Sequence, residues 1–380
     1  MTVPCTYELP GQINTKELQS ILCIMQERGG SDLFISGGMP IVMQVHSRNE
    51  WITKKKLGYS EVYDLVTEIY GENAKSLLGS ATEIDYLYEF KKEVSSTTEF
   101  SKKKRFRFRL NIVSCERGGQ TTVTMTFRTI PTIIPSVVEL KVEQDIIDLC
   151  KGIDQGLIII VGATGNGKST LLASLLRDQL EDPSEDRVLV TIESPIEFVF
   201  DQVETNGSIF TQLEVGKNVL SFQRGLRNAL RMAPTTILIG ESRDYETMKT
   251  TVEASVTGHV VFSTIHANTA ADSIQRMVEV YPEELQKQAK LSIVRALNLV
   301  VAQRLIKTVD GKKIAIREFL IFNKEIRDHL ANANDISFAA TEMMNKFGKP
   351  MMVDVERYYA EGIISQSTYE RQKKNYEEGE

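Results

Sequence analysis

The fold of this chain is decided by the stretch Gly162-Ala163-Thr164-Gly165-Asn166-Gly167-Lys168-Ser169. It follows an apolar, β-branched run at residues 157–161 and precedes residues 170–176, whose apolar side chains recur at helical spacing. A strand, a glycine-rich turn and a helix in this order are the setting that a nucleotide-phosphate loop requires. The sequence therefore predicts an α/β domain that binds a nucleotide at the end of a buried strand.

The residues of this loop have separate chemical roles. Glycines let the backbone wrap closely around phosphates and point its N–H groups inward, and the helix N-terminus adds partial positive charge. We expect Lys168 to reach the β- and γ-phosphates and the Ser169 hydroxyl to ligate Mg²⁺. The residues expected to bind ATP with Mg²⁺ are Gly162, Ala163, Thr164, Gly165, Asn166, Gly167, Lys168, Ser169 and Thr170.

Length and composition limit the class of protein. A chain of 380 residues is long enough for two domains, and its net charge of −6 argues against nucleic acid as a direct ligand. The first residues lack a basic start and an apolar core, and no apolar run reaches the length of a membrane span. The four cysteines form no Cys-x-x-Cys pair. These features predict a cytoplasmic protein with reduced thiols.

The first third of the sequence predicts a small α+β domain over residues 1–130. Apolar spacing favours helices at 15–27 and 60–70, and strands at 32–36, 41–45, 85–90, 105–113 and 121–128. Pro131 and Pro135 then bracket a stretch that suits neither element type. We therefore place an interdomain linker at residues 131–143.

The remaining residues alternate between strand and helix patterns. Apolar strands are expected at 157–161, 188–192, 237–239 and 260–262, with helical segments between them. This alternation predicts a parallel sheet covered on both faces, within a domain over residues 144–330. Residues 331–380 are expected to form a helical tail.

Carboxylates directly follow two of the predicted strands. Phosphate hydrolysis requires a base or a water-positioning carboxylate near the γ-phosphate. Glu241 follows the strand at 237–239 in the Walker B arrangement, so we predict that it is the catalytic carboxylate. Glu193 follows the strand at 188–192 and is predicted to support Glu241 in catalysis. The alternative for Glu193 is a purely structural role.

Two histidines, His259 and His266, lie on either side of the strand expected at residues 260–262. His266 falls at the carboxyl end, the side on which nucleotides bind in parallel sheets, so it could sense the γ-phosphate or couple neighbouring subunits. His259 precedes the same strand. The alternative for both is a hydrogen-bonded histidine at a strand end.

The most basic stretch, residues 102–110, alternates arginines with apolar side chains. Three interpretations remain open: a solvated strand face, a nucleic-acid stripe, or arginine fingers that reach a phosphate in another subunit. A nucleic-acid stripe would need aromatic side chains on the basic face, and the predicted strand turns them the other way. The candidate arginine fingers are Arg105, Arg107, Arg109, Arg117 and Arg128.

Taken together, the motifs of this chain resemble those of the secretion ATPase superfamily, the motors of type II/IV secretion and type IV pili. The matching segments are the Walker A loop (162–169), the Asp box (191–197), an atypical Walker B (239–244), the His box (257–268) and a late Gln303-Arg304-Leu305. Ser194 stands where the Asp box usually has Asp, which leaves Glu193 as its acidic residue. Residues 193–199 and 308–322 are most similar to the Dot/Icm type IVB ATPases and their conjugative-plasmid counterparts.

This resemblance implies an assembly and a function. It implies a homohexameric ring in which a PAS-like N-terminal domain precedes a RecA-like P-loop domain, with ATP between them and N-terminal arginines on the phosphates. The ring would dock at the cytoplasmic face of a membrane-spanning secretion complex, associated peripherally with the inner membrane. We expect an ATPase that powers type IV secretion of the Dot/Icm-like or conjugative kind. The alternatives are a type IV pilus retraction or assembly motor, a nucleic-acid translocase, and a nucleotide-binding scaffold.

Overall fold

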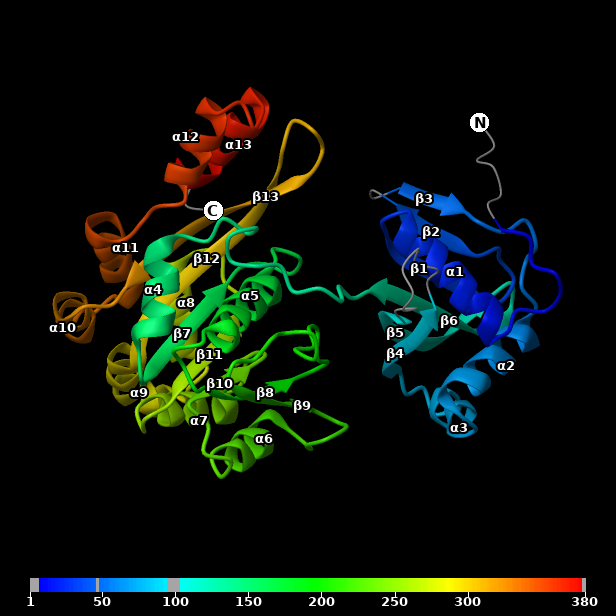
Figure 1. The fold of residues 1–380 in the computed structure, drawn as a ribbon, viewed down its shortest axis with the longest axis horizontal. Helices are drawn as coiled ribbons and strands as arrows, with labels where there is room; N and C mark the ends of the chain where they lie inside the picture. Colours follow the sequence, from blue (N-terminus) through cyan, green and yellow to red (C-terminus); the bar gives the residue numbers. More distant parts are fainter. Residues whose placement is uncertain (1–6, 46–47, 94–102, 378–380) are drawn as a thin grey trace. The chain divides into compact units, whose positions relative to one another are not determined.

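The chain divides into two compact units, Met1–Thr132 and Ile133–Glu380. The computed structural model describes residues 7–45, 48–93 and 103–377 (Figure 1). Both units combine helices with a sheet, but the sheets differ in kind: the first is antiparallel and the second is mostly parallel. This confirms the α/β fold class with a smaller α+β unit ahead of it.

The first unit is a six-stranded antiparallel sheet with the strand order β3-β2-β1-β6-β5-β4. Leu18 and Leu22, on one stripe of α1, are fully buried in one cluster with Phe108 and Leu110 of β5. Phe108 and Leu110 share one face of the sheet because alternate residues of a strand point to the same side. Its elements are α1 (Thr15–Glu27), β1 (Gly30–Ser36), β2 (Val42–Val45), β3 (Arg48–Trp51), α2 (Tyr59–Tyr70), α3 (Asn73–Gly79), β4 (Ile84–Glu93), β5 (Lys103–Arg117) and β6 (Gln120–Thr129).

The second unit is built on a seven-stranded sheet with the order β13-β12-β7-β11-β10-β8-β9. Every neighbouring pair is parallel except β12 and β13. Its strands are β7 (Gly156–Val161), β8 (Val188–Glu193), β9 (Ile209–Glu214), β10 (Thr236–Ile239), β11 (Val260–Ile265), β12 (Leu297–Lys307) and β13 (Lys313–Ile321). Strands β7, β11 and β10 are neighbours and run parallel, so their carboxyl ends lie at the same edge of the sheet.

Helices cover both faces of this sheet. Ile159 of β7 packs in one cluster with α6 to α9, and Ile158 packs in another with α4 and α5, so the whole strand is buried (Figure 1). The sequence prediction of a parallel sheet covered on both faces is confirmed. The helices are α4 (Gln144–Gly152), α5 (Lys168–Glu181), α6 (Phe222–Ala229), α7 (Tyr245–Ser255), α8 (Ala270–Glu279), α9 (Glu283–Ala296), α10 (Lys324–Asn332), α11 (Ile336–Phe347), α12 (Met352–Ala360) and α13 (Gln366–Glu377).

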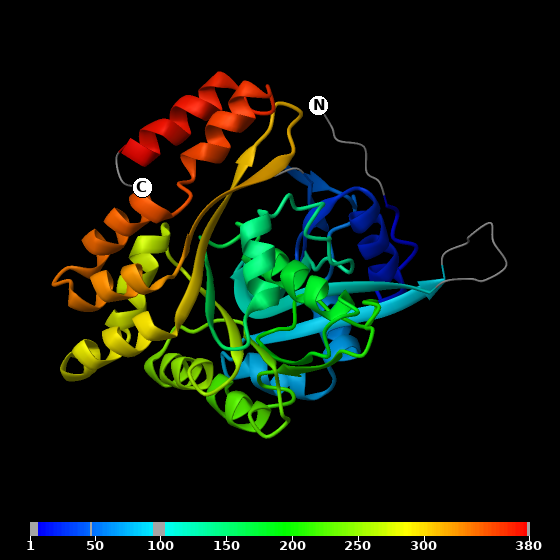
Figure 2. The ribbon, with the colours of Figure 1, turned by 60° about the vertical axis from the view of Figure 1, so that its left-hand side comes forward.

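Several segments differ from the sequence-based expectations, and strand β3 and helix α3 of the first unit are among the elements not expected. Strand β9 was not predicted. Residues 133–143, where a linker was expected, contribute Ile134 and Val137 to the core of the second unit. Residues 331–380 were expected as a helical tail; over the described residues 331–377 they are helical but add Met343 and Tyr358 to the core, and α12 lies beside the β12–β13 hairpin (Figure 2). None of the described helices is long and apolar enough to cross a bilayer.

Candidate active site

The glycine-rich loop joins β7 to α5 and has a backbone that only glycine suits at its two ends. Gly162 has φ 149° and Gly167, which precedes the first residue of α5, has φ 76°. A Cβ atom at Gly162 would lie 2.5 Å from the main-chain oxygen of Gln303, too close for any side chain. The loop therefore approaches strand β12 more closely than any other residue type would allow.

The lysine of the loop is held over the loop itself. Lys168 Nζ donates hydrogen bonds to the main-chain oxygens of Gly162, at 2.7 Å, and Ala163, at 3.3 Å. Burial lowers the pKa of Lys168, and the charges of Glu197 and Glu241 oppose that shift. A lysine over glycine-rich backbone at a helix N-terminus is the donor set that nucleotide phosphates require, so these residues fit ATP.

Strand β12 braces the loop through two hydrogen bonds. Gln303 Nε2 donates to the main-chain oxygen of Asn166 at 2.7 Å, and the Leu305 N–H donates to Asn166 Oδ1 at 3.3 Å. Gln303 Oε1 in turn accepts from Nε of Arg317 at 2.7 Å. The late Gln-Arg-Leu motif therefore fixes the position of the phosphate loop against the sheet.

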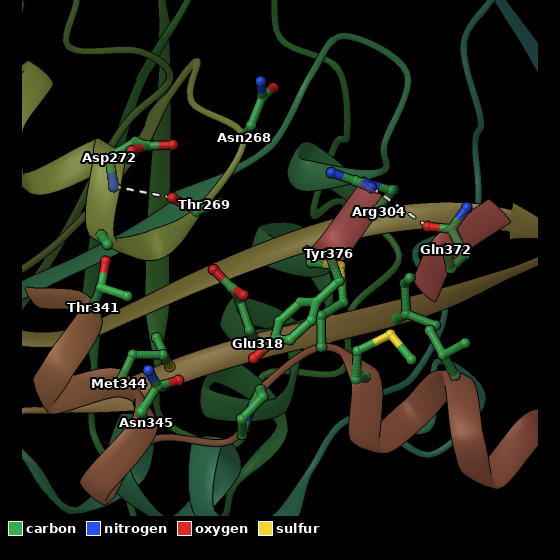
Figure 3. A pocket seen from close by; sticks show the side chains of 16 residues that line it. Asn268, Thr269, Asp272, Arg304, Glu318, Thr341, Met344, Asn345, Gln372 and Tyr376 are labelled. Carbon is green, nitrogen blue, oxygen red and sulfur yellow. Dashed lines mark hydrogen bonds between the residues drawn. The ribbon is translucent and has the colours of Figure 1, made fainter. Parts of the chain in front are cut away.

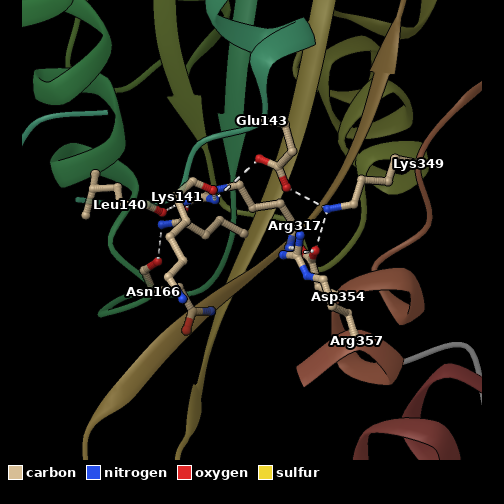
Figure 4. Close-up of polar contacts among 9 residues, drawn as sticks. Leu140, Lys141, Glu143, Asn166, Arg317, Lys349, Asp354 and Arg357 are labelled. Carbon is tan, nitrogen blue, oxygen red and sulfur yellow. Dashed lines mark hydrogen bonds and ion pairs between the residues drawn. The ribbon is translucent and has the colours of Figure 1, made fainter. Parts of the chain in front are cut away.

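Behind this brace, Arg317 lies almost wholly buried, at 1% exposure (Figure 4). Its guanidinium donates to the main-chain oxygens of Leu140, at 3.0 Å, and Lys141, at 3.1 Å, and pairs with Glu143. Lys349 pairs with Glu143 and so extends the ionic network toward α12. The sequence patterns indicated no role for Arg317. The signal that could have found it is an arginine at a position that strand alternation places in the core.

The acidic residue of the Asp box lies in a buried, confined setting at the end of β8. Glu193 is 8% exposed, and its Oε1 accepts hydrogen bonds from Thr191 Oγ1 at 2.7 Å and Gln212 Nε2 at 3.4 Å. Burial raises the pKa of Glu193 to about 7. Glu193, Ser169 and Gly240 line a cavity of about 30 Å³. That space suits one water or one small ion beside the Ser169 hydroxyl, which fits a Mg²⁺ ligand role for Ser169.

The Walker B carboxylate lies in a more open setting. Glu241 follows β10, and its Oε1 lies 3.3 Å from Nη2 of Arg243. It lines a cavity of about 360 Å³ together with His266 and Arg276. Burial lowers the pKa of His266, and the nearby charge of Lys168 lowers it further, so the imidazole is neutral near pH 7. The structure thus brings Glu241, His266 and Lys168 to the same edge of the sheet.

The second predicted histidine lies elsewhere. His259 precedes β11, at the opposite end of that strand from His266, and its Nδ1 is 3.1 Å from the main-chain oxygen of Ala254. Its own main-chain oxygen accepts from the N–H of Gly156, the first residue of β7. Its surroundings are those of a hydrogen-bonded strand-end histidine.

The candidate arginine fingers of the first unit fall into two groups. Glu89 pairs with Arg105 at 3.0 Å and lies 3.6 Å from Arg107, which is fully buried. Arg128 Nε lies 2.8 Å from Asp32. By contrast, Arg109 and Arg117 are exposed, and within the described residues their side chains make no hydrogen bond or ion pair.

The aromatic residues of the same strand point away from solvent. Phe106 is 4% exposed and Phe108 is fully buried in the core of the first unit. Neither ring is free to stack on a base, as single-stranded nucleic acid would require. Strand β5 therefore does not present the aromatic surface of a nucleic-acid stripe.

A larger cavity adjoins the phosphate loop on the side of the β12–β13 hairpin. It has a volume of about 860 Å³ and is lined by Gly167 and Thr170 of the loop region, Leu140, and Leu305 and Ile314 of the hairpin. Its lining combines apolar side chains with charged ones, among them Lys141, Asp310 and Lys312. Such a cavity next to phosphate-binding residues has the size and chemistry for the base and ribose of a nucleotide.

The proteins to which this chain is similar, in sequence and in structure, are secretion and pilus proteins. A family model described as Type II/IV secretion system protein matches residues 101–369. The type IV pilus retraction ATPase PilT of Pseudomonas aeruginosa is 33% identical over 312 residues, 82% of this chain and 84% of PilT. The X-ray structure of the Legionella pneumophila ATPase DotB has a TM-score of 0.82 and 34% identity, covering 96% of this chain and 97% of DotB. The pilus retraction motor PilT with bound ADP has a TM-score of 0.77 and 30% identity, covering 94% and 96%.

Proposed function

The chain belongs to the family of type II/IV secretion system proteins and is an ATPase, and we propose that it powers a type IV secretion machine of the Dot/Icm-like or conjugative kind. The arrangement of Lys168, Glu193 and Glu241 around one phosphate loop carries the enzymatic part of this proposal. The similarity to DotB over nearly the whole of both chains supports the secretion part.

Each residue at the sheet edge has a distinct role in the proposed hydrolysis. Residues 162–170 bind the phosphates of ATP through main-chain N–H groups and Lys168. Ser169 would hold Mg²⁺, which neutralises phosphate charge when bound. Glu241 orients the attacking water, and neutral His266 beside it donates or accepts a hydrogen bond near the γ-phosphate. Glu193 holds a water or the ion's hydration shell in the small cavity next to Ser169.

Arginines of the first unit would complete the site between copies of this chain. An arginine finger stabilises the charge of the transition state and raises the rate by about 10³–10⁵-fold. Arg109 and Arg117 are the candidates whose guanidinium groups are exposed and not engaged by a carboxylate of the described residues. We therefore expect Arg109→Ala or Arg117→Ala to lower kcat by about 10³-fold or more at unchanged melting temperature. If both variants keep the wild-type rate, neither arginine is a finger.

The proposed assembly is a homohexamer docked at the cytoplasmic face of a membrane-spanning secretion complex, held there peripherally. It is motivated by the motif resemblance and by the exposed arginines, which lie on a unit other than the one that carries the phosphate loop. Light scattering of the purified protein with a non-hydrolysable ATP analogue should give the mass of six chains. A monomeric mass under those conditions would contradict the ring.

A type IV pilus retraction motor is the second candidate. PilT of P. aeruginosa covers most of this chain at 33% identity, close to the identity with DotB. The two candidates differ in what fails when the gene is deleted from its host. Loss of substrate transfer with normal pilus retraction supports the secretion ATPase, whereas loss of retraction alone supports the pilus motor.

The enzymatic proposal is tested most directly with purified full-length protein. We expect Mg²⁺-dependent release of phosphate from ATP, and its loss in Lys168→Ala, because that substitution removes the charge that contacts the phosphates. Lys217→Ala is the matched control, since Lys217 is an exposed lysine on the loop after β9. Absence of ATP hydrolysis by the wild type, or equal rates in the wild type and Lys168→Ala, would contradict the proposal. Hydrolysis that rises steeply with added DNA and falls with salt would favour the translocase instead.

A further inference from the structure

A second cavity of the ATPase unit lies apart from the phosphate loop. It has a volume of about 340 Å³, within the range of roughly 300–1,000 Å³ that small-molecule sites occupy. Its walls come from the start of α8, from β12 and β13, and from the C-terminal helices α11, α12 and α13 (Figure 3). None of the loop residues 162–170 lines it, and neither Glu193 nor Glu241 does. The proposed ATPase chemistry leaves this cavity without a function.

The floor of the cavity contains a buried carboxylate. Glu318 of β13 is only 7% exposed, and its Oε1 accepts a hydrogen bond from the Ala270 N–H at 2.7 Å. Its Oε2 makes no hydrogen bond within the part of the chain that the structure describes, and the side chain points into the cavity (Figure 3). Burial raises the pKa of Glu318, because water is withdrawn from the carboxylate. A hydrogen-bond donor with positive charge would compensate this loss of solvation.

The remaining charges of the cavity make it acidic. Asp272, in the first turn of α8, supplies a second carboxylate. Among the described residues, the guanidinium that lines the cavity belongs to Arg304, which donates to Gln372 Oε1 at 3.4 Å and whose charge partly opposes the rise in the pKa of Glu318 (Figure 3). Two carboxylates against one guanidinium favour a cation over an anion.

Part of the lining is apolar and suited to a hydrocarbon chain. Met344, Met351 and Met352 line it together with Val355. Methionine side chains are flexible and polarisable, so they adapt to ligands of irregular shape. The half-exposed ring of Tyr376 lies next to Glu318 and offers a face on which a cation can rest (Figure 3).

We propose that this cavity binds a small organic cation, an alkylguanidinium or alkylammonium, whose charged head contacts Glu318 and Asp272 and whose hydrocarbon body packs on the three methionines. An anionic ligand would meet two carboxylates. A neutral apolar ligand would cover the Oε2 atom of Glu318 without giving it a hydrogen-bond donor, which costs free energy. A bound cation would also connect the start of α8 to the C-terminal helices, which meet at this cavity.

Calorimetric titration of the full-length protein tests the proposal without using ATP hydrolysis, so its outcome is independent of the proposed function. Agmatine, a four-carbon alkylguanidinium that also carries an ammonium group, is the probe. N-butylacetamide, a neutral molecule of similar size, is the comparison. We expect agmatine to bind and the amide not to bind. Glu318→Gln should weaken agmatine binding by about tenfold or more, because it keeps an acceptor for Ala270 but removes the charge.

Two further variants keep the test decisive. Asp272→Asn lies nearer the mouth of the cavity and should weaken agmatine binding by about threefold, so it replaces Glu318→Gln if that variant does not fold. Glu342→Gln removes an exposed carboxylate of α11 that does not line the cavity, and it should bind as the wild type does. The proposal is overturned if agmatine at millimolar concentration gives no binding heat. It is also overturned if the amide binds equally well, or if neither cavity variant weakens binding.

Discussion

The carboxylates at the ends of β8 and β10 are close neighbours in the fold but lie in different environments. Glu193 is buried, shares a cavity of about 30 Å³ with Ser169, and has a pKa raised to about 7. Glu241 borders a cavity of about 360 Å³ and lies 3.3 Å from Arg243. In sequence the two residues look alike, since each follows an apolar strand of the parallel sheet.

The difference shows how one sheet edge can supply two functions. A carboxylate with room for substrate and a neighbouring guanidinium remains available to orient a water. A carboxyl group confined beside a hydroxyl, with its pKa near neutral pH, can hold a water while it is protonated and a small ion once it is ionised. We therefore propose that Glu241 acts in hydrolysis and that Glu193 organises the ion site, and three predictions test that division.

The largest effect is expected at Glu241. Glu241→Gln should lower kcat by about 10²–10⁴-fold, because the amide cannot act as a base toward water. Affinity for ATP should persist, since Lys168 and the loop are unchanged. Phosphate release and binding of a fluorescent ATP analogue measure the two properties separately. Glu246→Gln, a substitution on the adjacent helix outside the cavity, is the control. A near wild-type rate in Glu241→Gln, with strong loss in Glu193→Gln, would reverse the assignment.

At Glu193 we expect an effect of intermediate size, on the pH dependence of the protein's stability. The pKa in the folded protein is about 7, above the ordinary value of 4.5, so the native state binds the proton more tightly than the unfolded state. Stability from this group is therefore fully present below pH 4.5 and is lost as pH rises through 7, by up to about 3 kcal/mol.

Urea denaturation of the nucleotide-free protein at pH 5 and pH 8 measures this linkage. Glu193→Gln cannot ionise, so its stability relative to the wild type should be higher at pH 8 than at pH 5. Thr191→Val keeps the carboxylate but removes a hydrogen bond that lowers the pKa of Glu193, so its stability should fall between pH 5 and pH 8 at least as much as that of the wild type. An identical pH dependence in Glu193→Gln and the wild type would mean that Glu193 is ionised throughout.

The smallest effect is expected at Gln303, which holds the phosphate loop against β12. Gln303→Leu removes the hydrogen bond to Asn166 and leaves the buried Arg317 Nε without its acceptor. We expect KM for ATP to rise about tenfold with a smaller change in kcat, because the loop loses its fixed position. Arg357→Ala, at the half-exposed outer end of the same network, is the control. A change in kcat alone would indicate that Gln303 acts on one of the carboxylates rather than on ATP.

Local sequence was sufficient to predict much of the second unit. Runs of apolar residues at strand and helix periods depend on neighbours within one element, so they identified β7, β8, β10 and β11 and the coverage of both faces. Strand β9 could not be predicted in this way. Its residues are half-buried at an edge of the sheet and lack the continuous apolar pattern of the central strands.

Local sequence also could not predict which charged residues are buried. The alternation of β5 was predicted correctly, but Arg107 on the arginine face is buried and Arg109, two residues further on, is exposed. Which arginine is covered depends on segments that are distant in sequence, such as Glu89 on β4. For this reason sequence could propose five arginine fingers but could not rank them.

By itself, the sequence determined the phosphate loop, the parallel sheet and the family resemblance, because each depends on residue types at short, fixed spacings. Only the tertiary structure decided the pKa of Glu193, the Arg317–Gln303 brace and the acidic cavity at Glu318. Each of these arises where side chains from strands and helices far apart in the chain exclude water together. Desolvation depends on everything that surrounds a group, and no local spacing of residues encodes it.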